Sequence, residues 1–393
     1  MARFQLPEPK ADPLLELISR YRADNRQHKI DLGVGVYRND NGETPVLAAV
    51  KAAEAKLHND QNSKSYLGLT GDADFVDAYG EVIFGQCDHT VSGAQTPGGS
   101  GALRLAAEVF KTAYPDNTLW IGVPTWPNHL PLTQSAGVKT HTYEYFNKET
   151  QTVQFEQMLS AINTANPGDA VLLHGCCHNP TGADLTSDQW QQVAQLLSEK
   201  ELLPIIDIAY HGLGRGLEDD LAGTRLVVQH NPQTLVAASC SKNFGLYRDR
   251  VGAVYIAASD QQLANRCQAL FGHIARRMYS MPPDHGAAAV RIILSNSSLR
   301  DQWQSELDTM VSRVVALRNE IASSGKALNL SFVAEQRGMF SLLPLNAQQV
   351  NEMINEHAVY LAGDGRINIA GCQLAQVPQF IEALQKVGFA HHS

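Results

Sequence analysis

The chain has 393 residues, of which 44% are hydrophobic and 18% charged, and its formal net charge is −9. This composition is typical of a folded protein, and the length exceeds what one core usually holds, so we expect two domains. The negative charge, without a long Lys/Arg run, argues against nucleic-acid binding.

No apolar stretch approaches the roughly 18 residues of a membrane span, and the N-terminus lacks a signal-peptide core, so we expect a cytoplasmic protein with no membrane contact. The six cysteines form no CxxC pair, and we predict no disulfide.

The periodicity predicts helices and strands in alternation along most of the chain. Asp12 and Pro13 begin a stretch with helical apolar spacing, which predicts a first helix over 12–24. Helical stretches then alternate with short apolar runs, which predicts a mostly parallel sheet covered by helices on both faces. Thr186 and Gln189 have the spacing of a capping box at a helix start. The apolar runs cover residues 118–123, 170–175, 203–210, 234–239 and 250–258.

The last quarter of the chain has a different pattern. Residues 298–325 form a long amphipathic stretch that ends in a glycine, which predicts a long helix leading out of the large sheet. Beyond it, short strands and helices mix, as in a smaller α/β layer. We expect this layer to recruit the N-terminal segment as well.

Candidate site residues follow the ends of the apolar runs, because ligands bind beyond the carboxyl ends of strands in open α/β sheets. The turn "GGSG" at 98–101 precedes an apolar helix, where free N–H groups favour a phosphate. Asp207 follows another run, and a buried carboxylate needs a cationic or hydrogen-bonding partner. Lys242 lies in "ASCSKNFGLYRDR" among small and apolar neighbours, which lower the proton affinity of an amine toward its reactive neutral form.

One ligand accounts for these candidates together. Pyridoxal 5′-phosphate has a phosphate for the glycine turn, a basic ring nitrogen for Asp207, a flat face for Trp126 and a carbonyl for Lys242. The residues that this ligand would meet are Gly99, Ser100, Trp126, Asp207, Ser239, Ser241, Lys242 and Arg250.

A zinc site is the alternative raised by the segment "HGCCH", with His174, Cys176, Cys177 and His178. Adjacent cysteines with no second pair of ligands fit the tetrahedral spacing of zinc badly. We therefore predict no metal.

The segments "TPGGSGALR", "HGCCHNPTG", "SKNFGLYRDRVG" and "GRINIAG", in this order and spacing, resemble the class I aminotransferases, in their aspartate and aromatic-amino-acid branch. The resemblance covers essentially the whole chain. It implies the fold type I of pyridoxal-phosphate-dependent transferases: α/β, with a large domain around a mostly parallel seven-stranded sheet flanked by helices, and a smaller α/β domain. We expect residues 1–45 to form an N-terminal arm and part of the small domain, 46–305 the large cofactor-binding domain, and 306–393 the small domain.

The resemblance also implies roles for individual residues. Lys242 would form the Schiff base with the cofactor and then move a proton, with Asp207 and Tyr210 as the other catalytic residues; His129 would orient Asp207. Cofactor-binding residues would be Gly99, Ser100, Trp126, Asn179, Asp207, Tyr210, Ser239, Ser241, Lys242, Arg250 and, from the neighbouring subunit, Tyr66. Substrate-binding residues would be Gly35, Trp126, Asn179, Arg366 and, from the neighbouring subunit, Arg276.

The implied function is transfer of the amino group of aspartate, phenylalanine, tyrosine or tryptophan to 2-oxoglutarate by a ping-pong mechanism. A homodimer with shared active sites is expected, with residues 1–10 as an arm on the partner. Arg276 favours dicarboxylic substrates, whereas Met281 departs from the family pattern and suits an apolar ring. A strict aspartate aminotransferase is the alternative, and a β-lyase a more distant one, because a β-lyase would not need two carboxylate clamps.

Overall fold

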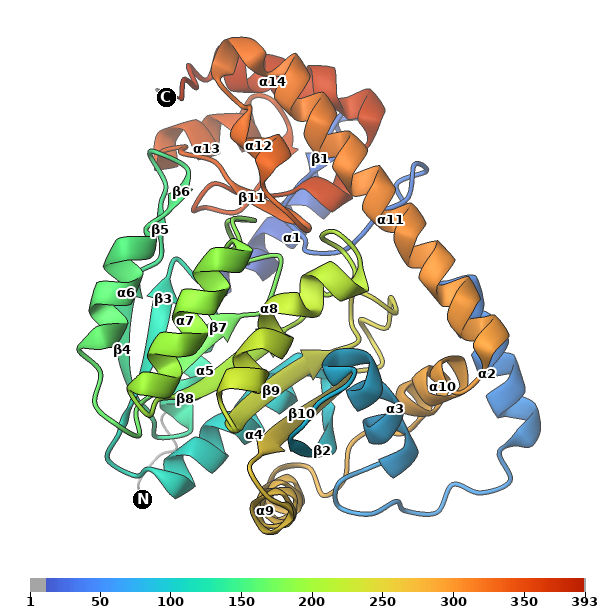
Figure 1. Cartoon of the computed structure of the whole chain (residues 1–393). Coiled ribbons are helices and arrows are strands. Elements are labelled where there is room, and N and C mark those ends of the chain that lie inside the picture. Colours follow the sequence, from blue (N-terminus) through green and yellow to red (C-terminus); the bar gives the residue numbers. More distant parts are fainter. Residues whose placement is uncertain (1–11, 392–393) are drawn as a thin grey trace, which may run out of the picture.

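The computed structural model of the protein describes residues 12–391 (Figure 1). The arm predicted for residues 1–10 lies outside this range. Within residues 12–391, no helix combines the length and the apolar character that crossing a membrane would require.

A seven-stranded sheet forms the centre of the larger part of the molecule. Its strand order is β2-β10-β9-β8-β7-β3-β4, and β10 alone runs antiparallel to the others. The predicted mostly parallel seven-stranded sheet is therefore confirmed. The strands are β2 (Thr90–Pro97), β3 (Thr118–Val123), β4 (Lys139–Glu144), β7 (Ala170–His174), β8 (Leu203–Ile208), β9 (Gln233–Ser239) and β10 (Val251–Ala258).

Helices cover both faces of this sheet (Figure 1). Successive residues of β8 enter opposite cores, since Ile205 packs in one apolar cluster and Ile206 in the other, as the pleat of a strand buried on both faces requires. One face is covered by α4 (Gly98–Ala113), α5 (His129–Ser135) and α9 (Gln261–Met278). The other elements of this part are α2 (Ala48–Asp60), α3 (Ala73–Phe84), α6 (Phe155–Asn163), α7 (Ser187–Glu199), α8 (Leu217–His230), α10 (His285–Leu294) and the hairpin strands β5 (Phe146–Asn147) and β6 (Thr152–Val153).

Two predicted helix starts have the expected caps. Asp12 accepts hydrogen bonds from the backbone N–H groups of Leu14 and Leu15 at the start of α1 (Pro13–Ala23). Thr186 and Gln189 form a reciprocal capping box at the start of α7. Both caps satisfy N–H groups that have no partner within the helix.

The smaller layer is joined to the sheet by α11 (Ser297–Ser324), a 28-residue helix that runs from α2 and α10 to α14 (Figure 1). The strand β1, near the N-terminus, pairs with β12 in parallel, so the N-terminal segment does join this layer. Residue 305 lies inside α11, and the domain boundaries stay a prediction. The elements of this layer are β1 (Ile30–Asp31), β11 (Phe340–Leu342), β12 (Val359–Tyr360), β13 (Arg366–Asn368), α12 (Phe332–Glu335), α13 (Ala347–Asn355), α14 (Val377–Lys386) and the 3₁₀ turns η1 (Lys326–Leu328), η2 (Ile369–Gly371) and η3 (Leu374–Gln376).

Candidate active site

A pocket of about 200 Å³ lies at the carboxyl ends of the central strands, where they face the smaller layer. This position is where open α/β sheets bind ligands. The lining residues are Gly35, Gly99, Ser100, Leu103, Trp126, His174, Asn179, Asp207, Ala209, Tyr210, Ser239, Ser241, Lys242, Tyr247 and Arg250.

Lys242 occupies the turn that follows β9. Its Nζ atom lies 4.6 Å from the centre of the Tyr210 ring. Desolvation lowers the pKa of Lys242 to about 8; the charges of Arg250 and Arg366 also lower it, whereas Asp207 opposes the shift. An amine with this pKa is partly neutral near physiological pH, and the neutral form is the nucleophile.

Asp207 is the next-to-last residue of β8, and His129 reaches it from the start of α5. The His129 Nε2 atom lies 3.1 Å from Asp207 Oδ2. Burial by itself raises the pKa of Asp207, but the hydrogen bond with His129 and the charge of the nearby Lys242 outweigh burial and lower the pKa. Asp207 is therefore a carboxylate, held in one orientation, inside the pocket.

Thr125 and His174 extend this hydrogen-bonded chain, and the sequence analysis assigned neither to it. Thr125 Oγ1 lies 2.7 Å from His129 Nδ1 and 3.0 Å from His174 Nε2. Desolvation lowers the pKa of His174 to about 3, so the ring is neutral. His174 ends β7 directly opposite Asp207 in the sheet. Its position at a strand end was a signal that could have indicated this role from the sequence.

The start of α4 and the Arg250 guanidinium form a cradle for an anion. Gly98 has φ +70°, and a Cβ atom there would come within 2.6 Å of Arg250 Nη2, so the close approach requires glycine. Arg250 donates to Tyr247 O at 3.0 Å and to Ser241 Oγ at 3.4 Å. Within the described chain, Arg250 forms no ion pair with a carboxylate. Its charge and the helix start are therefore free to bind a phosphate.

A second cation, Arg366, enters the site from β13. Its Nη2 donates to Gly33 O at 3.0 Å, and its Nη1 lies 3.4 Å from Asn179 Oδ1. The guanidinium packs on the Phe340 ring at 4.6 Å from the ring centre. Asn179 Nδ2 in turn donates to Tyr210 Oη at 3.2 Å. Arg366 therefore presents a fixed planar fork, which suits a carboxylate.

Gly35 lines the same pocket, at a position where a side chain would not fit. A Cβ atom at Gly35 would come within 2.9 Å of Phe340 Cζ. The backbone at 33–36 can therefore approach the Arg366 side of the pocket closely.

Tyr66 and Arg276 lie outside the pocket of this chain. Tyr66 is 90% exposed, and Arg276 is exposed with Ser280 Oγ as its hydrogen-bond acceptor at 3.0 Å. A single chain thus does not bring these two predicted residues to the other site residues.

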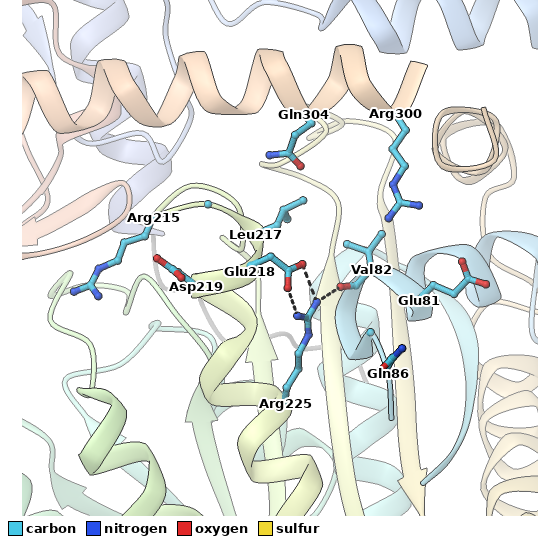
Figure 2. A pocket seen from close by; sticks show the side chains of 12 residues that line it. Glu81, Val82, Gln86, Arg215, Leu217, Glu218, Asp219, Arg225, Arg300 and Gln304 are labelled. Atoms are coloured by element: carbon cyan, nitrogen blue, oxygen red, sulfur yellow. Dashed lines mark hydrogen bonds and ion pairs between the residues drawn. The ribbon is translucent and has the colours of Figure 1, made fainter. Parts of the chain in front are cut away.

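A larger hollow of about 610 Å³ lies elsewhere, between α3, α8 and α11 (Figure 2). Its central arginine, Arg225, forms an ion pair with Glu218 at 2.5 Å and also donates to Val82 O. The lining mixes arginines with acids and contains no lysine, cysteine or histidine. We therefore interpret this hollow as a solvated cleft.

The "HGCCH" segment brings only part of its zinc candidates together. Cys176 and Cys177 lie near Asp220, with their potential ligand atoms within 4.8 Å of one another. Both Asp220 oxygens, however, already accept backbone N–H groups, from Gly212, Gly214 and Arg215. His174 faces Thr125 instead. The carboxylate thus has a structural role, and the absence of a metal stays a prediction.

Fold and site together define a class of protein, an α/β enzyme with a lysine, a carboxylate and an anion cradle at the sheet's carboxyl edge. Residues 27–384 match the family model of the class I and II aminotransferases. The chain therefore belongs to the class I and II aminotransferases.

Individual relatives cover nearly the full length. The tyrosine aminotransferase of Rhizobium meliloti (strain 1021) is 47% identical over 94% of this chain and 95% of its own. The aspartate aminotransferase of Escherichia coli (strain K12) is 42% identical over 96% of this chain and 98% of its own. A crystal structure of the aromatic-amino-acid aminotransferase of Burkholderia pseudomallei, covalently bound to pyridoxal phosphate, superposes with a TM-score of 0.94 at 36% identity, covering 97% of this chain and 98% of its own.

Proposed function

We propose that this aminotransferase uses pyridoxal 5′-phosphate to move the amino group of aspartate and aromatic amino acids to 2-oxoglutarate by a ping-pong mechanism. The observation that carries the proposal is a pocket lined by the Lys242 amine and the Asp207 carboxylate, with the Arg366 fork beside it, in contact with the lining residue Asn179. The names of the relatives support both substrate classes.

The pocket fits the cofactor group by group. The cradle of Gly99, Ser100, Ser239, Ser241 and Arg250 would hold the phosphate, since its N–H groups, hydroxyls and guanidinium suit an anion. Trp126 would cover one face of the ring. When bound, the cofactor supplies an electron-accepting ring that stabilises negative charge on the substrate Cα.

Asp207 would form an ion pair with the protonated ring nitrogen. Its lowered pKa keeps it ionised, and its hydrogen bond to His129 fixes which oxygen faces the pocket. The neutral His174, linked through Thr125, would hold the His129 ring in one orientation.

Lys242 would anchor the cofactor covalently and, once displaced by substrate, carry a proton between the substrate Cα and cofactor C4′. Its pKa near 8 allows it to accept and return a proton close to neutral pH. Burial raises the pKa of Tyr210, which keeps its hydroxyl protonated as a hydrogen-bond donor toward the cofactor's phenolic oxygen. Asn179 is within reach of the same hydroxyl.

Arg366, assisted by Asn179, would bind the α-carboxylate through two parallel hydrogen bonds. The distal carboxylate of aspartate or 2-oxoglutarate would meet Arg276 of a second subunit. We therefore propose an obligate two-fold homodimer, in which Tyr66 of one subunit completes the phosphate site of the other. The exposure of Tyr66 and Arg276 in the single chain supports the proposed dimer.

Steady-state kinetics with aspartate, phenylalanine and tyrosine, each with 2-oxoglutarate, tests the proposal. We expect comparable kcat/KM values for aspartate and an aromatic donor, and parallel lines when both substrates are varied. A strong preference for aspartate would instead favour the strict aspartate aminotransferase. No turnover with any donor would overturn the proposal.

A further inference from the structure

Arg318 of α11 is a buried cation with no acidic partner. Its side chain is 2% exposed, and within the described residues it forms no ion pair. Its acceptors are backbone carbonyls and one hydroxyl, all in the segment 333–341. Nε donates to Gly338 O at 3.1 Å, and Nη1 donates to Val333 O at 2.9 Å and to Ser341 Oγ at 3.0 Å. Nη2 donates to Gly338 O at 2.7 Å, to Arg337 O at 3.0 Å and to Phe340 O at 2.6 Å.

This bonding pattern requires an arginine. The guanidinium directs its N–H groups at five acceptors of one curved segment, four backbone carbonyls and one hydroxyl, which a lysine ammonium cannot reach from a single point. Burial lowers the pKa of Arg318 to about 9, so the group keeps its charge at neutral pH. A buried charge is costly unless its donors are satisfied. The segment 333–341 is thus folded around this side chain.

The same segment adjoins Arg366. Strand β11 pairs antiparallel with β13, with Leu342 opposite Arg366. The Phe340 ring lies under the Arg366 guanidinium and meets the Tyr210 ring edge-on at 5.7 Å. A shift of Phe340 would therefore move the support of the Arg366 fork.

The segment also adjoins the loop that carries Asn179. Arg337 N donates to Gly182 O at 2.7 Å. Gly182 has φ +69°, and it packs against the backbone of Phe340 so closely that a Cβ atom has no room. Arg318 thus holds a piece of backbone that contacts both the Arg366 strand and the Asn179 loop.

A buried polar network surrounds Arg318 and fixes it in turn. Ser341 Oγ donates to Gln336 Oε1 at 2.6 Å, and Gln336 Nε2 donates to Gln151 Oε1 at 3.1 Å. Gln151 comes from the β5–β6 hairpin and also donates to Leu342 O at 2.9 Å. Hydrogen bonds from Arg318 on α11 and from Gln151 on the β5–β6 hairpin therefore both hold the segment 333–341.

We propose that Arg318 is a positioning residue for the substrate α-carboxylate: it sets the spacing between Arg366 and Asn179 through the backbone of 333–341. The inference rests on the proposed function, because it concerns the substrate of that site. Arg318 touches no group of the pocket itself. Its loss should weaken carboxylate binding and leave the cofactor side of the pocket intact.

The test compares Arg318→Lys and Arg318→Met with wild type and with Leu317→Ala, a fully buried neighbour on α11 whose truncation leaves a cavity but keeps the Arg318 guanidinium and its acceptors. On cofactor-loaded enzyme we would measure kcat and KM for the amino acid, the Kd of succinate as an unreactive dicarboxylate, the Kd of pyridoxal phosphate, and Tm. For the Arg318 variants we expect KM and the succinate Kd to rise about tenfold or more, with kcat and cofactor Kd within about threefold of wild type.

Leu317→Ala should lower Tm and leave KM unchanged. Unchanged KM and succinate Kd in folded Arg318→Lys would overturn the inference. An equal rise of KM and succinate Kd in Leu317→Ala would also overturn it, because the effect would then come from general destabilisation. If both Arg318 variants fail to fold, Ser341→Ala removes one acceptor and should raise KM about threefold; no rise there overturns the inference. An inactive wild type, by contrast, would overturn the proposed function.

Discussion

The two walls of the pocket are built in different ways. The cofactor wall comes from β7, β8 and β9, whose register fixes His174 beside Asp207 and Asp207 beside Ala237 through the ladder of backbone hydrogen bonds. The substrate wall comes from β11 and β13, which have three residues each. There, side chains bind carbonyls instead: Asn368 Nδ2 donates to Val34 O and Val36 O at 2.6 and 2.7 Å.

This difference indicates that the two walls depend on different kinds of interaction for their position. Buried strands of five to seven residues fix the position of Asp207 and of the turn that carries Lys242. The short strands have few backbone hydrogen bonds of their own, so their position depends on the side chains that bind them. Changes in the first wall should therefore remove chemistry, and changes in the second should alter affinity.

The largest effect is expected at Lys242 in the cofactor wall. Lys242→Ala should lower kcat by roughly 10⁴-fold or more, because it removes both the covalent anchor and the base. The visible absorption band of the bound cofactor should also shift toward that of free pyridoxal phosphate. Lys139→Ala, at the exposed edge strand β4, is the matched control and should behave as wild type. Normal turnover by Lys242→Ala would break the proposed mechanism.

Arg366→Lys tests the substrate wall. We expect kcat/KM for every amino acid to fall about 100-fold, because lysine loses the two-pronged contact with a carboxylate. The Kd for pyridoxal phosphate should stay within about twofold, since the cradle around Arg250 is untouched. A parallel loss of cofactor binding would show that the two walls are not independent.

Arg276→Met asks whether a second subunit completes the substrate wall. The kcat/KM for aspartate should drop about 30-fold while that for phenylalanine changes little, since only aspartate has a distal carboxylate to lose its partner. Arg277→Met is the control, because Arg277 is the adjacent exposed arginine on α9. Equal losses in both variants, or a monomer in solution with full activity, would contradict the shared site.

The smallest effect concerns the pKa of Lys242. Its pKa is lowered to about 8, so the reactive neutral amine is a minority below pH 8 and predominates above it. The initial rate of cofactor capture by cofactor-free protein should thus rise about tenfold from pH 7 to pH 9 and then level off. Stopped-flow absorbance measures this rate. A rise that continues to pH 10.5 would mean that Lys242 keeps an ordinary pKa.

The sequence predicted the regular part of the fold well, for a physical reason. Strands β3, β7, β8, β9 and β10 are buried and read as apolar runs. Strands β2 and β4 lie at the sheet edges and are more polar, so no run revealed them. Only the family resemblance supplied the count of seven.

The site residues were likewise predictable where they adjoin buried apolar strands, and not elsewhere. Asp207, near the end of an apolar run, and Lys242, just after one, could be inferred from these positions. Arg366 required the resemblance, because a three-residue strand has no readable period. The proposed roles of Thr125 and Arg318 depend on contacts between residues 49 and about 20 positions apart. Sequence patterns do not carry such pairings.

Borohydride reduction of the cofactor-loaded enzyme, followed by mass spectrometry of its peptides, would identify the amine that binds the cofactor. Reduction fixes the cofactor to the amine that binds it. We predict the added mass of the reduced cofactor on Lys242 alone. Its appearance on another lysine, or on none, would contradict the role proposed for Lys242.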